Sequence, residues 1–381
     1  MICGVIKESA SENRVAVTPQ TVEKLSKIGL KIIIEKELGT HLNWKDACYV
    51  NAGAKALSRD EVIEQSDLLL CVEAPSPEIL NKLPRGTTVI GFLDPFRQSK
   101  TVDALCENRL TSISVEMVPR STYAQKFDAL SSQASLAGYA AVTLAAERSQ
   151  RIMPMMTTPA GTIKPLKVFI IGVGVAGLQA IATARRLGAR VEAFDTRPVV
   201  EEQVKSLGAK FVKIDLGETG ETENGYAREL TPGQLQIQQR EMQKVCINSD
   251  IVITSALLFG RPAPKLINKE TIEAMAAGSI IVDMAASGGG NADGTVLDEE
   301  VNVNGVTIIG HKNLARCYPL NSSEMYASNL HSLLNDILVK NDEGHLALKK
   351  DSDILQSCMI TERGEIRNKQ LRQHYISEGI S

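Results

Sequence analysis

The stretch Val168-Phe169-Ile170-Ile171-Gly172-Val173-Gly174-Val175-Ala176-Gly177-Leu178-Gln179-Ala180 changes from an apolar run to three spaced glycines and then to helix-forming residues. This order predicts a strand, a tight turn and a helix. Gly172 permits the sharp turn, Gly174 lets a pyrophosphate approach the backbone, and Gly177 lets the helix pack closely on the sheet. The N-terminus of such a helix favours a phosphate. We therefore expect a dinucleotide to contact Gly172, Gly174, Val175, Ala176 and Gly177.

A second predicted strand, residues 190–194, ends in Asp195, about 20 residues after the turn as this fingerprint requires. A carboxylate there accepts hydrogen bonds from both hydroxyls of the adenosine ribose and repels a 2′-phosphate, which favours NAD(H) over NADP(H). Arg197 lies nearby and argues the other way, because arginine accommodates a 2′-phosphate. The glycine pattern alone is weak evidence. In this context we assign NAD(H) and place Asp195, Thr196 and Arg197 at the ribose.

The 381 residues are too many for one ordinary core and predict two domains. A formal net charge of −3, without a basic run, argues against a nucleic-acid partner. The seven cysteines are scattered without a CxxC pair, which is typical of reduced thiols in a cytosol-like compartment and indicates no zinc or other metal site. The N-terminus does not resemble a signal peptide, and no segment reaches the roughly 18 consecutive apolar residues of a membrane helix.

Short apolar runs alternate with helix-compatible segments throughout the chain, which predicts parallel sheets covered by helices. The expected fold is α/β, with two Rossmann-like domains. An alanine-rich helix over residues 136–148 links them, and the segment after residue 315 crosses back to complete the first domain. The predicted domains are residues 1–130 with 315–381, which form a discontinuous N-terminal domain, and residues 131–314, which form the NAD(H)-binding domain.

Four other segments attract attention. Residues 117–138 are densely polar between apolar flanks, and form either a solvated connection or a binding site. Residues 153–162 read as a loop whose methionines fill gaps in a core. Residues 216–234 form a long loop, typical of a lid or of disorder, whose Tyr226 either covers a ligand or projects into solvent. His311 reads as structural rather than catalytic, since it has no demonstrated partner.

Two further segments follow predicted strands and would form a crevice wall at their carboxyl ends. They are Ser255-Ala256-Leu257 and residues 288–291 (GGGN). We therefore add Ala256 and Leu257 to the expected cofactor-binding residues.

Several motifs together resemble one family over nearly the whole chain. Residues 12–19 (ENRVAVTP) are similar to the start of both branches of the alanine dehydrogenase and pyridine-nucleotide transhydrogenase superfamily. The other motifs resemble the NAD(H)-binding domain I of proton-translocating transhydrogenases: Arg120 with Gln125, residues 128–133 (DALSSQ), Met155-Met156, residues 160–162 (AGT) and residues 172–180 (GVGVAGLQA). Residues 312–319 (KNLARCYP) depart from the family pattern, near the expected crossover.

The resemblance implies two Rossmann-like domains, a homodimer, and a nicotinamide held in the cleft between the domains. It also implies that Arg120, Gln125, Asp128 and Ser131 surround that nicotinamide. Arg120 and Asp128 would form an ion pair, Ser131 would fix the carboxamide, and Gln125 would reach toward a second nucleotide. The alternative for Arg120 and Asp128 is an ordinary surface ion pair. Tyr226 would close over NAD(H).

The alanine dehydrogenase branch resembles a different motif, in which a lysine after the third strand and a histidine after the fourth bind and activate pyruvate. This chain has residues 72–75 (VEAP) and 92–95 (FLDP) at those places, with neither lysine nor histidine. Reduction of an oxo acid needs a cation for the carboxylate and an acid for the carbonyl oxygen. The sequence therefore argues against an amino-acid (alanine) dehydrogenase.

The resemblance implies a Re/Si-specific, proton-translocating transhydrogenase subunit, the soluble chain of a split alpha subunit. Hydride would pass from NADH to NADP⁺ held on a partner beta subunit, and the second, membrane-spanning chain of the alpha subunit would complete the assembly. Direct hydride transfer needs positioned rings and excluded water rather than an acid-base pair. The chain would then be cytoplasmic and held at the inner membrane through its partners. A non-catalytic NAD-binding redox sensor is the other alternative.

Overall fold

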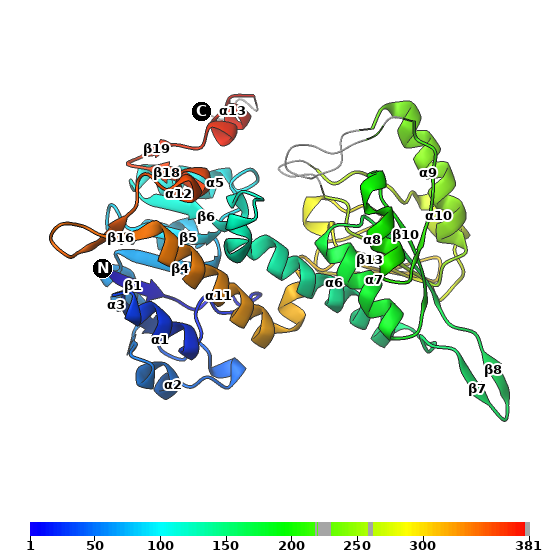
Figure 1. Cartoon of the computed structure of the whole chain (residues 1–381), viewed down its shortest axis with the longest axis horizontal. Helices are drawn as coiled ribbons and strands as arrows, with labels where there is room; N and C mark the ends of the chain where they lie inside the picture. Colours follow the sequence, from blue (N-terminus) through cyan, green and yellow to red (C-terminus); the bar gives the residue numbers. More distant parts are fainter. Residues whose placement is uncertain (218, 220–229, 258–261, 378–381) are drawn as a thin grey trace. The chain divides into compact units, whose positions relative to one another are not determined.

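The computed structural model describes residues 1–217, 219, 230–257 and 262–377, and its internal contacts divide the chain into two compact units (Figure 1). Unit 1 comprises Met1–Gln133 and Tyr318–Ser381, and unit 2 comprises Ala134–Cys317. The first domain is thus discontinuous. The expected boundaries, after residues 130 and 314, lie just before these divisions.

The sheet of unit 1 has the strand order β19-β18-β6-β5-β4-β1-β2-β3. Neighbouring strands among β1 to β6 are parallel, whereas β18 pairs antiparallel with both β6 and β19. The bounds are β1 (Ile2–Val5), β2 (Lys31–Glu35), β3 (Lys55–Leu57), β4 (Leu68–Glu73), β5 (Thr88–Phe92), β6 (Thr111–Ser114), β18 (Met359–Glu362) and β19 (Glu365–Ile366). The segment after residue 318 therefore extends the first sheet.

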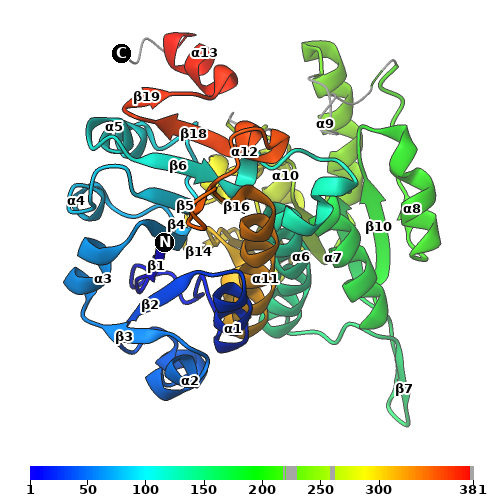
Figure 2. The same cartoon turned by 60° about the vertical axis from the view of Figure 1, so that its left-hand side comes forward.

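Helices cover both faces of this sheet (Figure 2). Side chains of α1 (Pro19–Lys27) and α11 (Pro319–Ile337) share one apolar cluster with alternate residues of the central strands. The opposite cluster contains side chains of α3 (Arg59–Gln65), α4 (Pro77–Leu80) and α5 (Ser99–Glu107). Strands buried on both faces need near-continuous apolar sequence, as in β4. Smaller elements complete the unit: α2 (Asp46–Asn51), β16 (Leu338–Lys340), β17 (Leu346–Leu348), α12 (Asp353–Cys358) and α13 (Lys369–Ser377).

The sheet of unit 2 has the strand order β11-β10-β9-β12-β13-β15-β14, and all its pairs are parallel except β14 with β15. Its strands are β9 (Lys167–Ile171), β10 (Arg190–Phe194), β11 (Lys210–Phe211), β12 (Ile251–Thr254), β13 (Ile280–Asp283), β14 (Glu300–Val303) and β15 (Val306–Ile309). Its helices are α6 (Ala129–Arg148), which begins in unit 1, α7 (Val175–Arg186), α8 (Glu201–Ser206), α9 (Pro232–Ile247) and α10 (Lys269–Ala274).

The six parallel strands of each unit follow the same plan. Numbered along the chain within each unit, they lie in the order 3-2-1-4-5-6, which is that of a dinucleotide-binding fold. The order reverses between the first and fourth strands, β1 and β4 in unit 1 and β9 and β12 in unit 2. Ligands of such sheets bind outside the carboxyl ends of the strands at this switch point.

Two expectations about the segment between α6 and β9 are wrong. Residues 153–162 do not form a simple loop, because β7 (Met156–Thr158) and β8 (Gly161–Ile163) pair as an antiparallel hairpin. Met153 is buried, but Met155 and Met156 are 65% and 45% exposed and so do not fill a core. The hairpin pairs with no other sheet, which leaves both of its faces largely without cover.

Candidate functional site

The glycine turn lies at the switch point of unit 2, directly after β9. Gly172 has φ of +92°, a conformation that side chains disfavour, and a Cβ there would lie 2.8 Å from Ser255 Oγ. A Cβ on Gly177 would lie 2.0 Å from the carbonyl oxygen of Gly172. A Cβ on Gly174 would meet nothing within 4 Å. The turn itself therefore requires two of the glycines, and the third faces open space where a pyrophosphate is expected.

The N-terminus of α7 faces this space without a side-chain cap. Gly174 is the N-cap residue and supplies no side-chain acceptor for the first N–H groups of the helix. Val175 in the first turn is 41% exposed. Unpaired N–H groups at the positive end of a helix are suitable donors for an anion. This geometry matches the expected roles of Val175 and Ala176, although binding by these residues stays a prediction.

A fourth glycine, which the sequence did not single out, positions the same helix end. Gly138 lies on α6, and a Cβ there would lie 2.1 Å from the carbonyl oxygen of Ala176. The two helices therefore cross with backbone contact at the first turn of α7. The composition of α6 gave no signal for this contact, since its many alanines conceal which small residue is indispensable.

Asp195 follows β10 beside the glycine turn, and its carboxylate is fully engaged. Its Oδ2 accepts hydrogen bonds from Val173 N (2.8 Å) and Arg197 Nη2 (2.9 Å). Its Oδ1 accepts from the backbone N and from Nε of Arg197, both at 2.9 Å. The side chains of Asp195 and Arg197 are only 6% and 15% exposed. Asp195 thus lies where the sequence places it, but it is paired with Arg197. Thr196 accepts a hydrogen bond at its carbonyl from Thr219 Oγ1.

The loop after β12 is held by a buried asparagine. Asn291 Oδ1 accepts from Ala256 N (3.1 Å), and its Nδ2 donates to the carbonyls of Ala256 (2.9 Å) and Pro264 (2.8 Å). Asp283, fully buried at the end of β13, accepts from Asn291 N at 2.7 Å. The sequence predicted a crevice wall here but did not identify these two residues. Ala256 lies at the switch point, and Leu257 beside it is 39% exposed.

The four expected nicotinamide residues lie in unit 1, around the start of α6. Arg120 and Gln125 are exposed, and Gln125 lies in the 3₁₀ helix Tyr123–Phe127. Asp128 accepts hydrogen bonds from Ser131 N (2.8 Å) and Ser131 Oγ (2.6 Å). This arrangement is an N-cap of α6, which explains why the helix begins at Ala129 rather than at residue 136. The expected ion pair of Arg120 with Asp128, and the contacts of all four residues with a nicotinamide, stay predictions.

Tyr226 lies outside the described residues. Among the residues that are described, no group of three or more histidine, cysteine, aspartate or glutamate side chains could hold a metal ion. No helix within the same residues is long and apolar enough to span a bilayer.

Comparison with known families covers both units. A model described as the N-terminal domain of alanine dehydrogenase/PNT matches residues 4–137, and one described as the C-terminal domain matches residues 141–369. The chain belongs to the alanine dehydrogenase/PNT family.

Members of both branches of this family are similar to the chain along nearly its full length. It is 40% identical over 372 residues to a chain of the split NAD(P) transhydrogenase subunit alpha of Rickettsia prowazekii, with 96% of each chain covered. It is 27% identical over 386 residues to an alanine dehydrogenase of Staphylococcus saprophyticus, with 97% of this chain and 95% of that protein covered. The crystal structure of a transhydrogenase from Sinorhizobium meliloti superimposes with a TM-score of 0.84 at 36% identity, covering 97% of this chain and all of that one.

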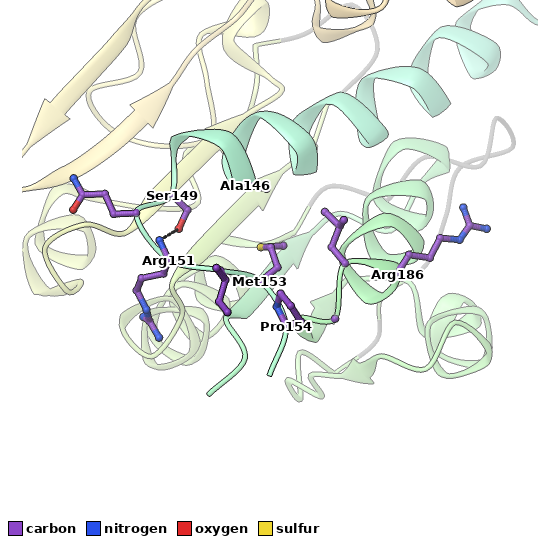
Figure 3. Close-up of a pocket in the computed structure, with 10 residues that line it drawn as sticks. Ala146, Ser149, Arg151, Met153, Pro154 and Arg186 are labelled. Carbon is purple, nitrogen blue, oxygen red and sulfur yellow. Dashed lines mark hydrogen bonds between the residues drawn. The ribbon is translucent and has the colours of Figure 1, made fainter. Parts of the chain in front are cut away.

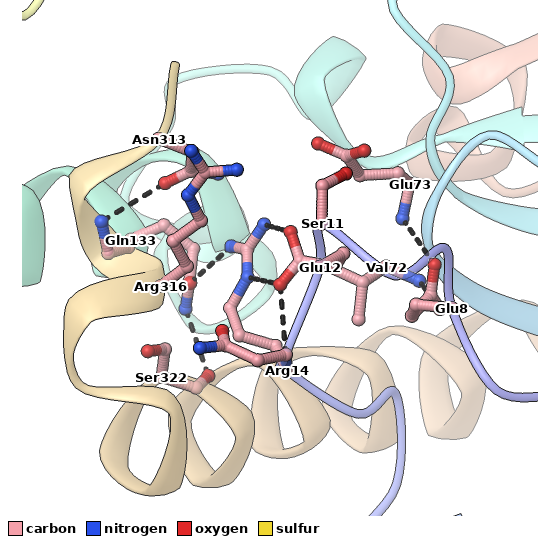
Figure 4. A network of polar contacts seen from close by, with 12 residues as sticks. Glu8, Ser11, Glu12, Arg14, Val72, Glu73, Gln133, Asn313, Arg316 and Ser322 are labelled. Carbon is pink, nitrogen blue, oxygen red and sulfur yellow. Dashed lines mark hydrogen bonds and ion pairs between the residues drawn. The ribbon is translucent and has the colours of Figure 1, made fainter. Parts of the chain in front are cut away.

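Within the alanine dehydrogenase/PNT fold, the switch point of unit 1 carries carboxylates (Figure 4). Glu8, which follows β1, accepts from Val72 N (2.6 Å) and Glu73 N (3.2 Å) at the end of β4. Glu116 similarly accepts from the backbone N–H groups of Leu93 and Asp94 after β5. Burial raises the pKa of Glu8 to about 8 and that of Glu116 to about 7. This edge offers acids where an oxo acid would require a cation.

A buried ion pair lies beside these carboxylates in unit 1. Arg14, 1% exposed, donates from Nε and Nη2 to the two oxygens of Glu12 at 2.8 and 2.7 Å. Its Nη1 donates to Gln133 Oε1 at 2.7 Å, and Gln133 Nε2 donates to the carbonyl of Ser322. The guanidinium is therefore occupied by protein partners, and it joins residues 12–14 to α11.

A pocket of about 710 Å³ lies elsewhere in unit 2 (Figure 3). It is formed by the segment after α6 and by the C-terminal end of α7, opposite the glycine turn. Its lining includes Arg151, Ile152, Pro154, Arg186 and Leu187. The hairpin β7–β8 begins just beyond Pro154, so the pocket lies at the base of the hairpin rather than at the candidate dinucleotide site.

Proposed function

We propose that the chain is the NAD(H)-binding subunit of a Re/Si-specific, proton-translocating transhydrogenase. One observation carries this proposal: the two units share a strand order but differ at their switch points. Unit 2 has an open glycine turn facing an uncapped helix, whereas unit 1 has the carboxylates of Glu8 and Glu116. The first arrangement suits a dinucleotide, and the second does not suit an oxo acid. The name of the Rickettsia relative supports the same assignment.

In unit 2, the chain's own groups would bind and orient NADH. The N–H groups of α7 donate to the pyrophosphate, and Gly174 leaves room for it. Asp195, anchored by Val173 N, receives the adenosine ribose. Asn291 holds Ala256 in place at the other side of the switch point. These contacts fix the dinucleotide while the nicotinamide ring stays available for hydride transfer.

In unit 1, Arg120, Gln125, Asp128 and Ser131 would surround the nicotinamide. The cap between Asp128 and Ser131 orients both side chains before any ligand binds. Arg120 and Gln125 are exposed and so can meet a ligand. The reaction is NADH + NADP⁺ → NAD⁺ + NADPH, in which a hydride moves between two C4 atoms. Since no proton is exchanged in this step, the residues need only orient the rings and exclude water.

The proposed assembly contains other chains. NADP(H) would be held on a beta subunit, and a separate membrane-spanning chain of the alpha subunit would couple the reaction to proton movement. The chain itself would be cytoplasmic, at the inner membrane through these partners. We also propose a homodimer. The hairpin β7–β8 supports it, because Met156 and Ile163 form a cross-strand pair and are each 45% exposed.

Two alternatives can be separated from this proposal in one set of assays. An alanine dehydrogenase would oxidise NADH with pyruvate and ammonia, and a redox sensor would bind NADH without transferring hydride. We expect no oxidation with pyruvate and ammonia, and rapid reduction of an NADP⁺ analogue once the NADP(H)-binding subunit is added. Turnover with pyruvate and ammonia alone would contradict the proposal.

A further inference from the structure

The carboxylate of Asp195 occupies a complete set of hydrogen-bond donors. Two are backbone N–H groups, of Val173 and Arg197, and two are Nε and Nη2 of the Arg197 guanidinium. All four distances are 2.8 or 2.9 Å. A carboxylate has about four lone-pair positions, so the donors saturate it. Two backbone N–H groups and a bidentate arginine are also the donors that bind phosphate groups.

The donors do not depend on the carboxylate for their positions. The N–H of Val173 belongs to the glycine turn, which is fixed by the contact of Gly177 with Gly172. The Arg197 guanidinium is also held from the turn, because Nη2 donates to the carbonyl of Val173 at 3.2 Å. Both side chains of the pair are largely buried. Removing the carboxylate would therefore leave the donors around a vacant anion position.

We propose that Arg197, with the N–H groups of Val173 and Arg197, forms a 2′-phosphate site that the Asp195 carboxylate fills. The chain selects NAD(H) because its own anion blocks this site, and Arg197 is a specificity-determining residue. This inference rests on the dinucleotide site proposed above. The carboxylate lies where the adenosine ribose is expected, and a 2′-phosphate is an anion attached to that ribose.

Arg197 thereby acquires two opposite effects. With Asp195 present, it neutralises and orients the carboxylate that excludes the phosphate. With Asp195 absent, it would bind the phosphate itself. A change of this one carboxylate should then change the preferred nucleotide, with no new cation introduced.

The test uses isothermal titration calorimetry on the full chain, with ADP, 2′,5′-ADP, NADH and NADPH as ligands. For Asp195→Ala we expect 2′,5′-ADP to bind about tenfold to a hundredfold more tightly than ADP, and NADPH more tightly than NADH. The double variant Asp195→Ala/Arg197→Gln should lose this preference. Glu192→Ala is the matched control, because it removes an exposed carboxylate of β10 that pairs with Lys210. It should keep the wild-type selectivity.

The outcomes separate this inference from the proposed function. If the wild type binds NADH but Asp195→Ala does not prefer 2′,5′-ADP, the latent site is wrong and the proposed function survives. A double variant that keeps the preference would also overturn the role of Arg197. If the wild type binds neither NADH nor ADP, the proposed function itself fails. Asp195→Ser, checked by its thermal midpoint, takes the place of Asp195→Ala if the alanine variant does not fold.

Discussion

At the scale of single residues, the glycines of the turn after β9 differ in what they contribute. Gly177 has backbone atoms of Gly172 against the position of its missing Cβ, whereas Gly174 faces open space. The first is needed for the turn to form. The second is needed only if a ligand enters the space, which gives a direct separation of stability from binding.

We expect Gly177→Ala to lower the free energy of unfolding by about 3 kcal/mol, since the new methyl group meets a backbone carbonyl that cannot move away. Gly174→Ala should unfold like the wild type but bind NADH about tenfold more weakly, or about 1.4 kcal/mol. Urea unfolding and calorimetric titration measure the two effects. Full NADH affinity in a folded Gly174→Ala variant would argue against a pyrophosphate at this turn.

Arg14 makes a second prediction at this scale. Its guanidinium is buried and pairs with Glu12, so Arg14→Met leaves an uncompensated carboxylate and should cost about 3–5 kcal/mol of stability. Arg59→Met removes an ion pair with Glu35 in which the arginine side chain is 39% exposed, and should cost at most about 1 kcal/mol. Chemical denaturation compares them. Similar losses in the two variants would contradict the importance of burial here.

The sequence predicted where Asp195 lies, because the spacing from the glycine turn and the end of a strand together determine the position. It did not predict the pairing with Arg197, which depends on a side-chain conformation that no periodicity encodes. The cap formed by Asp128 and Ser131 was also missed. Both residues were interpreted only as ligand contacts, although a hydroxyl three residues after an aspartate is typical of a helix start.

At the scale of elements, two buried carboxylates close the ends of the strands of unit 1. Glu8 and Glu116 accept the backbone N–H groups that follow β4 and β5. Their burial makes the charged forms unfavourable, which raises the pKa of each. Groups near Glu8 include Glu12 and Glu73, whose negative charges act in the same direction.

The raised pKa values predict how stability changes with pH. Glu8 binds its proton more tightly in the folded chain, with a pKa of about 8, than in the unfolded chain, with 4.5. Its contribution is therefore complete below about pH 4.5 and is lost as the pH rises through about 8. We expect Glu8→Gln to reduce the loss of stability between pH 5 and pH 8, measured as urea midpoints. Exposed Glu23→Gln is the control, and equal slopes for wild type and Glu8→Gln would contradict the assignment.

The loop after β12 gives another prediction for an element. Asn291→Ala leaves the N–H and carbonyl of Ala256 without their partner, which costs about 1–3 kcal/mol per buried group. We expect lower thermal stability together with weaker NADH binding. Asn304→Ala, which removes one exposed hydrogen bond to Glu273, is the control. Unchanged NADH affinity in Asn291→Ala would show that Ala256 does not line the site.

Long apolar runs were the best predicted elements, because strands buried on both faces leave a strong signal. Short, exposed pairs were the worst. The hairpin β7–β8 has three residues in each strand, and its exposed methionines were read as core residues because their hydrophobicity does not report where they lie. The antiparallel edge strand β14, which alternates partly buried and exposed residues, was not identified.

At the scale of the whole molecule, one strand order serves two purposes. Both sheets have the plan of a dinucleotide-binding fold, but only the switch point of unit 2 has the glycine turn. In unit 1 the same place is filled by Glu8, whose hydrogen bonds stabilise the strand ends. Family membership therefore fixes the fold, and the residues at the two switch points distinguish the functions within the family.

The proposed homodimer can be tested through the hairpin. Met156→Ser/Ile163→Ser removes the exposed cross-strand apolar pair, and we expect it to shift the sedimentation equilibrium toward monomer because less apolar surface can be buried. Val199→Ser, which changes another exposed apolar residue of unit 2, should leave the equilibrium unchanged. An equally strong dimer in the hairpin variant would exclude the hairpin from the interface, and a monomeric wild type would contradict the dimer itself.

The most direct test of the central claim follows the hydride itself. The chain is loaded with NADH carrying deuterium at both C4 positions and mixed in a single turnover with the NADP(H)-binding subunit loaded with NADP⁺. Mass spectrometry of the products then locates the label. The proposed function predicts one deuterium in NADPH and one in NAD⁺. NADPH that contains solvent hydrogen instead, or bound NADH that yields no NADPH, would contradict it.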